Sequence, residues 1–150
     1  MVEKEKVRIV VIGRGEPTPR QLELLKKALG ADVEIVATLQ QVNSPKDITS
    51  ALEHHGAEAV FSFILHPTVI GALQTARRFK EFDYFVASTQ AVKTAEVGSA
   101  EEAERLCEEL GADIPNIKVL PNGKVSVRCT KTVKLLKNPI LKIEAEEEIA

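Results

Sequence analysis

Residues 7–13, VRIVVIG, lead through the rest of the loop GRGEP into residues 18–30, TPRQLELLKKALG. The first run is short and almost continuously apolar, which is typical of a strand buried on both faces of a parallel sheet. Thr18 then supplies a helix N-cap, Pro19 suits the first helical position and Gln21 completes a capping box. Because Gly30 follows the helical stripe as a usual C-terminal stop, the stretch predicts a central strand, a loop and a helix.

The same strand-and-helix pattern recurs three times further along the chain. Further strands are expected at residues 33–39, 59–65 and 83–88. Further helices are expected at residues 44–56, 66–79 and 99–110, with Phe79 on the buried stripe of the middle one. Strands that alternate with helices in this way predict right-handed crossovers and a parallel sheet with helices on both faces. The strand order stays open between 3-2-1-4 and 2-1-3-4.

From residue 116 the pattern changes from helical to strand-like. Asn122-Gly123 is the strongest short-range hairpin signal, and the apolar residues alternate behind it over residues 125–129. Asn138-Pro139 marks a further turn, after which residues 140–143 are expected to return as a short edge strand. An antiparallel hairpin is therefore expected to close the domain.

The composition is that of one compact domain. The chain has 150 residues, of which 44% are hydrophobic, and domains run to roughly 100–200 residues. We therefore predict a single domain of the α/β class, a three-layer Rossmann-like domain with a mainly parallel sheet. Its parts are βα repeats over residues 7–115, a basic antiparallel β-hairpin over residues 116–144 and an acidic tail over residues 145–150.

Charge is distributed unevenly along the chain. Residues 116–143 contain seven lysines and arginines and no acid, whereas residues 144–150 contain four glutamates. A basic block can follow a phosphate backbone, but this one has no aromatic side chain on which a base could stack. Lysines on a terminal strand also prevent edge-to-edge aggregation. The block contains more apolar side chains than one hairpin face can hide, which favours a homodimer over a nucleic-acid partner.

Cys107 and Cys129 lack the CxxC spacing of metal or redox sites, so we interpret them as ordinary core thiols in a reducing compartment. The apolar run at the start of the chain is too short for a signal peptide or a membrane span. A cytoplasmic protein with no membrane partner is therefore expected. The composition resembles that of heat-adapted proteins, which suggests a thermophile: Lys and Glu are abundant, Trp is absent, and Asn, Gln, Met and Cys are few.

Three polar segments are predicted at the edge of the sheet where its strands end. In open α/β sheets, ligands bind outside the carboxyl ends of the strands. The three segments follow the first, third and fourth strands and together offer backbone N–H groups, a guanidinium, an imidazole and hydroxyls, which suit a phosphate or other anion. The candidate ligand-binding residues are Gly13, Arg14, Gly15, Thr18, His66, Thr68, Ser88 and Thr89.

Each of these candidates also has a structural interpretation. The first loop is neither GxGxxG nor GxxxxGK[ST], so its glycines can simply make a tight turn that Thr18 caps. His66 is either a general base or a helix cap, because no acid lies close in sequence to orient it. Ser62 lacks the GxSxG elbow of a nucleophile. No His/Cys cluster predicts a metal site, and no cofactor is identified by the sequence.

The function that fits these segments is binding or sensing of a small anionic ligand, a nucleotide or another anionic metabolite, by a homodimer. One alternative is an enzyme that cleaves a phosphodiester, with His66 as acid or base and Arg14 stabilising charge. The other is a nucleic-acid or protein interaction module that uses the basic C-terminal hairpin. The sequence leaves open which of the three applies and whether the chain is an enzyme.

The βαβα order with a glycine-containing first loop, over residues 7–110, is similar in outline to Rossmann-like sensor domains. These include the CRISPR-associated Rossmann-fold domains that bind cyclic oligoadenylates at a dimer interface. The resemblance implies a nucleotide ligand and a dimer. Residues 88–93, STQAVK, stand where such sensors carry a glycine-rich turn, and here the glycines are missing.

Overall fold

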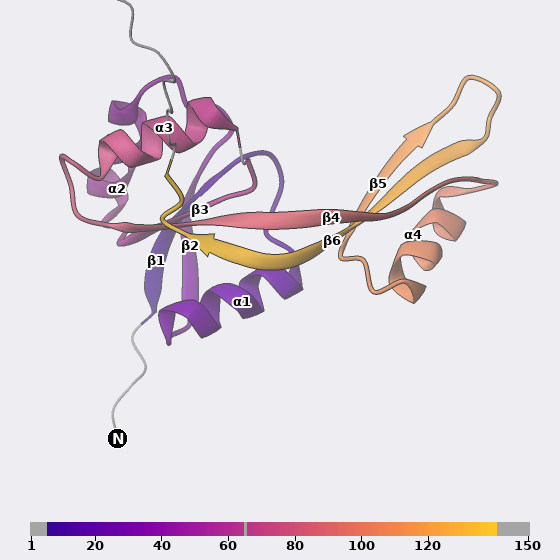
Figure 1. Ribbon diagram of the computed structural model, residues 1–150, viewed down its shortest axis with the longest axis horizontal. Helices are drawn as coiled ribbons and strands as arrows, with labels where there is room; N and C mark the ends of the chain where they lie inside the picture. Colours follow the sequence, from indigo (N-terminus) through magenta and orange to yellow (C-terminus); the bar gives the residue numbers. More distant parts are fainter. Residues whose placement is uncertain (1–5, 65, 141–150) are drawn as a thin grey trace, which may run out of the picture. The chain divides into compact units, whose positions relative to one another are not determined.

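The computed structural model describes residues 6–64 and 66–140. Its strands are β1 (Val7–Ile12), β2 (Val33–Leu39), β3 (Ala59–Ser62), β4 (Asp83–Val97), β5 (Ile114–Val119) and β6 (Val125–Lys137). Its helices are α1 (Pro19–Leu29), α2 (Pro45–His55), α3 (Pro67–Ala76) and α4 (Ala100–Glu109) (Figure 1).

The strands form one mixed sheet with the order β2-β1-β3-β4-β6-β5. β1 pairs with β3 and β3 with β4 in parallel, whereas β5 and β6 pair antiparallel. The predicted α/β class, mostly parallel sheet and C-terminal hairpin are therefore confirmed. The first four strands have the order 2-1-3-4, one of the two that the sequence leaves open.

The contacts of the chain divide it into two compact units that alternate along the sequence. The βα unit consists of Arg8–Arg14, Ile35–Val86 and residues 137–140. The hairpin unit consists of residues 6–7, Gly15–Glu34 and Ala87–Leu136. Strand β4 passes from one unit to the other between Val86 and Ala87.

Local sequence signals set the helix ends as predicted. The Thr18 hydroxyl accepts a hydrogen bond from the Gln21 backbone N–H at 3.2 Å, and the Gln21 side-chain oxygen accepts one from the Thr18 N–H at 3.0 Å. This reciprocal pair is the expected capping box. Gly30 and Gly56 end α1 and α2 in the left-handed conformation, with φ of 67° and 61°.

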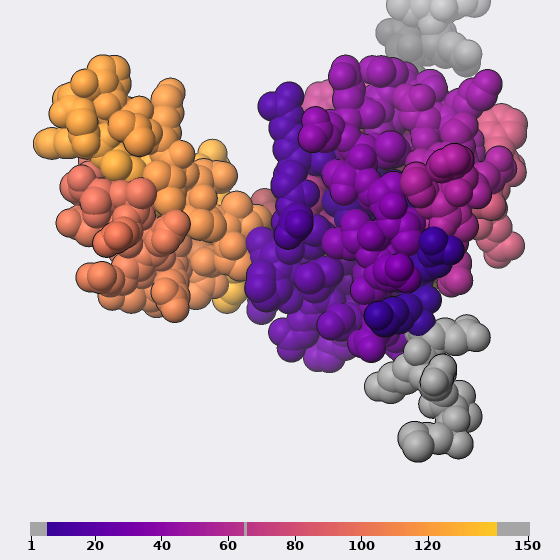
Figure 2. Space-filling view, turned by 180° about the vertical axis from the view of Figure 1, so that it is seen from behind, coloured from indigo at the N-terminus to yellow at the C-terminus, as the bar shows by residue number. Residues whose placement is uncertain are grey.

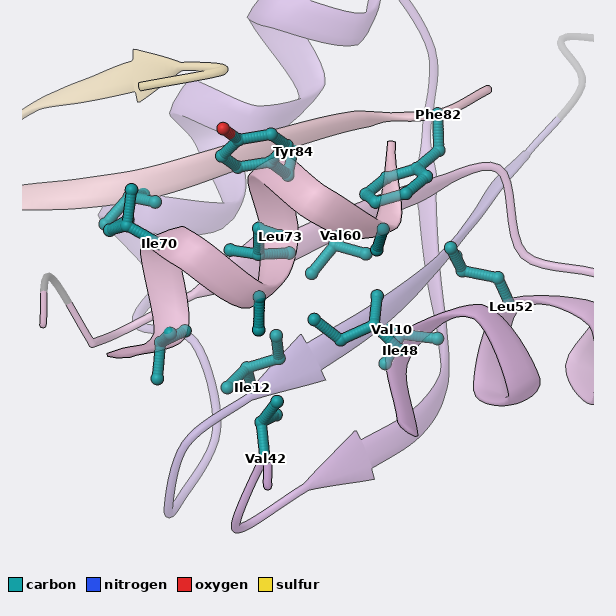
Figure 3. Packing of buried hydrophobic residues seen from close by; sticks show 14 of the residues in the cluster. Val10, Ile12, Val42, Ile48, Leu52, Val60, Ile70, Leu73, Phe82 and Tyr84 are labelled. Atoms are coloured by element: carbon teal, nitrogen blue, oxygen red, sulfur yellow. The ribbon is translucent and has the colours of Figure 1, made fainter. Parts of the chain in front are cut away.

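The core of the βα unit lies between one face of the sheet and two helices. Val10, Val60 and Tyr84 point from neighbouring strands toward Leu52 of α2 and Leu73 of α3 (Figure 3). All five side chains are fully buried or nearly so. Helices α2 and α3 also contact each other. Burial of this layer supplies the hydrophobic stabilisation of the unit.

The end of β6 returns to this unit through Asn138. Its side-chain oxygen accepts a hydrogen bond from the Tyr84 N–H at 2.8 Å, and the Tyr84 hydroxyl donates to the carbonyl of Pro139. Burial raises the pKa of the Tyr84 hydroxyl, and the charge of Arg77 opposes this. The chain bends at Asn138, where φ is 50°, which agrees with the predicted turn.

Three predicted boundaries in the strands and helices are wrong. Helix α3 ends at Ala76, so Phe79 is not on a buried stripe and is 80% exposed. Strand β3 ends at Ser62, because the Ser62 hydroxyl bonds to both backbone groups of Ile64 and turns the chain. Strand β4 does not end at residue 88 but continues to Val97.

The hairpin unit contains the β5–β6 hairpin and the helix α4 beside it (Figure 1). Val125, Val127 and Cys129 alternate on the buried face of β6 as predicted and pack with Ala103 and Cys107 of α4. In the space-filling view, the orange atoms of α4 and the hairpin form one packed body (Figure 2). The turn between the strands contains Gly123 with φ of 83°.

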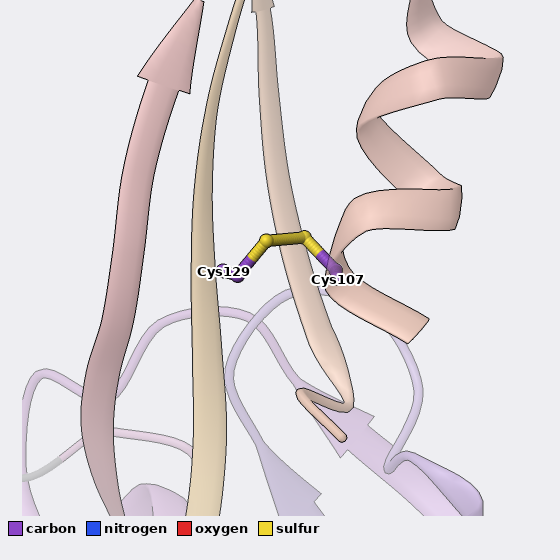
Figure 4. Close-up of a disulfide and its surroundings, with 2 residues drawn as sticks. All are labelled: Cys107 and Cys129. Carbon is purple, nitrogen blue, oxygen red and sulfur yellow. A yellow bond between two sulfur atoms is a disulfide. The ribbon is translucent and has the colours of Figure 1, made fainter. Parts of the chain in front are cut away.

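The prediction of two free core thiols is wrong. Cys107 on α4 and Cys129 on β6 form a disulfide, with Cα atoms 5.1 Å apart (Figure 4). Because the two residues are 22 apart in sequence, only the packing of the helix on the hairpin shows that they meet. The argument from free thiols for a reducing compartment no longer applies.

The described helices include none with the length and apolar character needed to cross a membrane. The predicted return strand over residues 140–143 lies outside the described residues apart from Ile140. Residue 65 and the tail over residues 145–150 also lie outside them.

Candidate functional site

The strand order of the βα unit marks one sheet edge as the candidate site. From β1 the chain moves to β2 on one side and then to β3 on the other, so the order reverses between β1 and β3. Ile12 lies opposite Ser62 in this parallel pair, so both strands end at the same edge. In open α/β sheets, ligands bind outside the carboxyl ends of the strands at such a reversal.

Gly13 brings the three loops at this edge into contact. Its N–H donates to the carbonyl of Leu39 at the end of β2 at 2.8 Å, and the Phe63 N–H donates to the carbonyl of Ile12 at 3.0 Å. Gly13 has φ of 129°, and a Cβ there would lie 2.7 Å from the Phe63 ring. Both the backbone angle and the space therefore require glycine at this position.

Arg14 follows directly and provides a positive charge. Its side chain is exposed. Within the described part of the chain, its guanidinium has neither an ion pair nor a hydrogen bond. Its five N–H donors are therefore available to a carboxylate or a phosphate.

His66 caps α3 at the same edge. Its Nδ1 accepts a hydrogen bond from the Thr68 N–H at 3.2 Å, so the predicted helix-cap alternative is confirmed. In the neutral ring this bond leaves the proton on Nε2, where it can be donated. The side chains of His66 and Thr68 are exposed. The first turn of α3 thus offers an imidazole donor and a hydroxyl beside a helix N-terminus, which favours anions.

Ser62 does not add a nucleophile to this edge. Its side chain is fully buried. Its hydroxyl accepts from the Ile64 N–H at 3.0 Å and donates to the Ile64 carbonyl at 3.1 Å. The single hydroxyl proton is used inside the turn, in agreement with the sequence interpretation.

The other half of the predicted site belongs to the hairpin unit. Gly13, Arg14, His66 and Thr68 lie in the βα unit, whereas Gly15, Thr18, Ser88 and Thr89 lie in the hairpin unit. Gly15 has φ of 89°, and a Cβ on it would meet open space.

The predicted turn at Ser88 and Thr89 is wrong, because both residues lie inside β4. Ser88 is half-buried and Thr89 is exposed. The polar composition of this segment suggests a turn, but it contains no Gly, Pro or Asn to break a strand. β6 lies next to β4 in the sheet order, and this pairing keeps the segment extended.

The Thr18 hydroxyl has a partner that the sequence analysis missed. It donates to Asp113 Oδ2 at 2.6 Å, and the Thr132 hydroxyl and N–H donate to the same carboxylate at 2.8 and 2.7 Å. Because a hydroxyl has one proton, Thr18 has none left for an anionic ligand. Burial acts to raise the pKa of Asp113, but these hydrogen bonds together outweigh it and hold the pKa below its ordinary value.

Sequence patterns do not reveal this network. Asp113 is 95 residues from Thr18 and 19 from Thr132. Arg20 completes it by donating from Nε to the Thr132 carbonyl at 2.6 Å, and Gln21 donates to the Thr132 hydroxyl at 3.1 Å. Since every polar group named here has a partner, the network ties α1 to β6 and offers no open ligand site.

The described residues contain no group of three or more His, Cys, Asp or Glu side chains that could hold a metal ion. No protein-family model matches the chain, and no curated protein or solved structure matches it either. Inference about function therefore starts from the geometry of the chain itself.

Proposed function

We propose that the βα unit binds a small anionic ligand, a nucleotide or another phosphate-bearing metabolite, at the carboxyl ends of β1 and β3. The observation that carries the proposal is the reversal of strand order between these two strands. The loops that follow them meet there, with Gly13 against Phe63. The chain is then a binding or sensor module of Rossmann-like type.

Each remaining candidate has one chemical role in this proposal. Gly13 has no Cβ, so the first loop packs against Phe63 and Arg14 follows directly at this edge. Arg14 supplies a guanidinium that can form two parallel bonds to a phosphate. His66 donates from Nε2 while its Nδ1 stays in the helix cap. Thr68 adds a hydroxyl in the first turn of α3.

The proposal includes two features expected from the sequence. A Rossmann-like arrangement is supported by the parallel strands β1, β3 and β4 and by α2 and α3 on one face. A homodimer is supported by apolar side chains that the hairpin leaves exposed, above all Val119, which is 69% exposed. Phosphodiester cleavage has no such support, because the described partner of His66 is a backbone amide and not a carboxylate.

A thermal-shift panel of nucleotides, cyclic oligonucleotides, sugar phosphates and non-phosphorylated analogues tests the binding proposal. A ligand at about a hundred times its Kd stabilises by about 2.7 kcal/mol, which raises Tm by about 5 °C or more in a chain of this size. We expect such a rise with at least one phosphate compound for the wild type and for Arg78→Ala, an exposed arginine elsewhere in the βα unit. We expect none for Arg14→Ala. No shift with any compound, or an undiminished shift in Arg14→Ala, would overturn the proposal.

A further inference from the structure

Strand β6 continues beyond the strand that pairs with it in the hairpin. β5 pairs with Val125–Thr130 only, from Val119 opposite Val125 to Ile114 opposite Thr130. β6 goes on to Lys137, and its neighbours in the sheet are β4 and β5. Among the described strands, none therefore lies along the β5 side of β6 from Lys131 onward. This segment is an open sheet edge within the hairpin unit.

Thr132 shows which backbone groups face this open edge. Its N–H donates to Asp113 and its carbonyl accepts from Arg20. Alternate residues of an antiparallel strand direct both backbone groups to the same side. Lys134 and Leu136 therefore direct their N–H and carbonyl groups to the same side of β6 as Thr132. At Thr132 itself these groups are already bonded to Asp113 and Arg20. The open part of the edge begins after Thr132.

An apolar groove accompanies this part of the edge. It has a volume of about 300 Å³ and lies between α1 and β6. Leu24 and Ala28 line it from α1, and Val133 and Leu135 line it from β6. Val133 is 45% exposed there, although it is a β-branched apolar residue. Every second side chain of an added strand would cover Val133 and Leu135.

The charge of the groove selects among the possible occupants. Among the described residues that line it, Lys27 and Lys134 are charged and none is acidic. β6 of a second copy is unsuitable, because antiparallel pairing would bring Lys131, Lys134 and Lys137 close to the same lysines of the partner. A nucleic acid would leave the apolar lining uncovered. The lining is complementary to a chain that alternates apolar and acidic side chains.

We propose that this edge binds an extended acidic segment of a partner protein by strand addition to β6. The segment pairs with the backbone of Lys134 and Leu136, places apolar side chains against Val133 and Leu135, and places carboxylates beside Lys27 and Lys134. This site lies in the hairpin unit and does not depend on the anion site of the βα unit.

Fluorescence anisotropy of the full chain with a labelled peptide of alternating valine and glutamate tests this proposal. The control peptide has lysine in place of glutamate. We expect the acidic peptide to bind and the basic one not to bind. The double variant Lys27→Glu/Lys134→Glu should weaken binding by on the order of tenfold or more. The matched control Lys46→Glu/Lys118→Glu changes two exposed lysines elsewhere by the same charge and should retain binding.

Several outcomes would overturn the proposal. If both peptides bind with equal affinity, or if neither binds, the groove does not select an acidic segment and the proposal fails. Unchanged affinity in Lys27→Glu/Lys134→Glu would place the peptide elsewhere. Sedimentation that shows a dimer dissociated by this variant would assign the groove to a second copy, and displacement of the peptide by an oligonucleotide would assign it to a nucleic acid. Circular dichroism and Tm of both variants show whether they fold, and two folded variants make the comparison decisive.

Discussion

Among the described residues of the βα unit, fifteen buried residues from strands, helices and loops form one apolar cluster, whereas the corresponding cluster of the hairpin unit has six. The hairpin unit adds two further links. One is the disulfide between Cys107 and Cys129. The other is the hydrogen-bond network around Asp113. A small apolar core thus goes together with a covalent link and a paired carboxylate, as expected where burial alone contributes little.

The largest effect is expected from the apolar core of the βα unit. Leu73→Ala removes a fully buried side chain of α3 and should lower the free energy of unfolding by about 2 to 5 kcal/mol. Urea denaturation measures the change. Phe79→Ala, just beyond the same helix, is the matched control and should have little effect because Phe79 is 80% exposed. A similar decrease in the free energy of unfolding in both variants would contradict the placement of Leu73 in the core.

The next effect concerns the covalent link of the hairpin unit. Replacing both Cys107 and Cys129 by alanine opens a loop of 22 residues and should cost about 3 kcal/mol on the loop-entropy model. Amide hydrogen exchange should rise in α4 and β6 and stay unchanged in α3, because α3 belongs to the other unit. Wild-type protein treated with a reductant should behave like the variant. A uniform rise in exchange would show that the two units do not differ in this way.

The smallest effect concerns the Asp113 carboxylate and depends on pH. Its folded-state pKa lies below the ordinary value of 3.8, so its hydrogen bonds stabilise the fold above that pH and are lost as the pH falls through the folded-state value. Asp113→Asn should cost about 1 to 3 kcal/mol at neutral pH and progressively less below about pH 4. Denaturation at several pH values measures this. The control variant Asp32→Asn changes an exposed acid of the same unit and should alter the free energy of unfolding at neutral pH very little.

The sequence predicts those parts of the fold that depend on near neighbours. Thr18 and Gln21 lie three residues apart and cap α1 as expected. Asn122-Gly123 lies at the hairpin turn. The predicted length of β4 was wrong. Its second half is mostly exposed and polar, and it stays extended because it lies next to β6 in the sheet, which the composition of the segment does not indicate. The prediction of free thiols at Cys107 and Cys129 was wrong because the disulfide joins residues of two different elements that lie 22 apart in sequence.

The residues of the candidate site also differ in whether neighbouring or distant parts of the sequence determine their environment. Gly13 and His66 each follow a strand of the parallel pair β1 and β3, so their placement at one edge of the sheet follows from the alternation of strands and helices. Thr18 was a candidate because the first loop leads into a helix N-terminus that attracts anions. Its hydroxyl instead donates a hydrogen bond to Asp113, which is 95 residues away in sequence. Ser88 and Thr89 depended on a strand end that does not exist. Contacts between distant segments decided each of these cases.

The alternation of the two units along the sequence has a practical consequence. Neither unit is a contiguous segment, because the chain changes unit after Val7, Arg14, Glu34, Val86 and Leu136. No gene truncation can express either of them alone. A protease that cuts once anywhere between residues 15 and 136 leaves two fragments that each hold part of both units, so a single cut cannot separate one unit from the other.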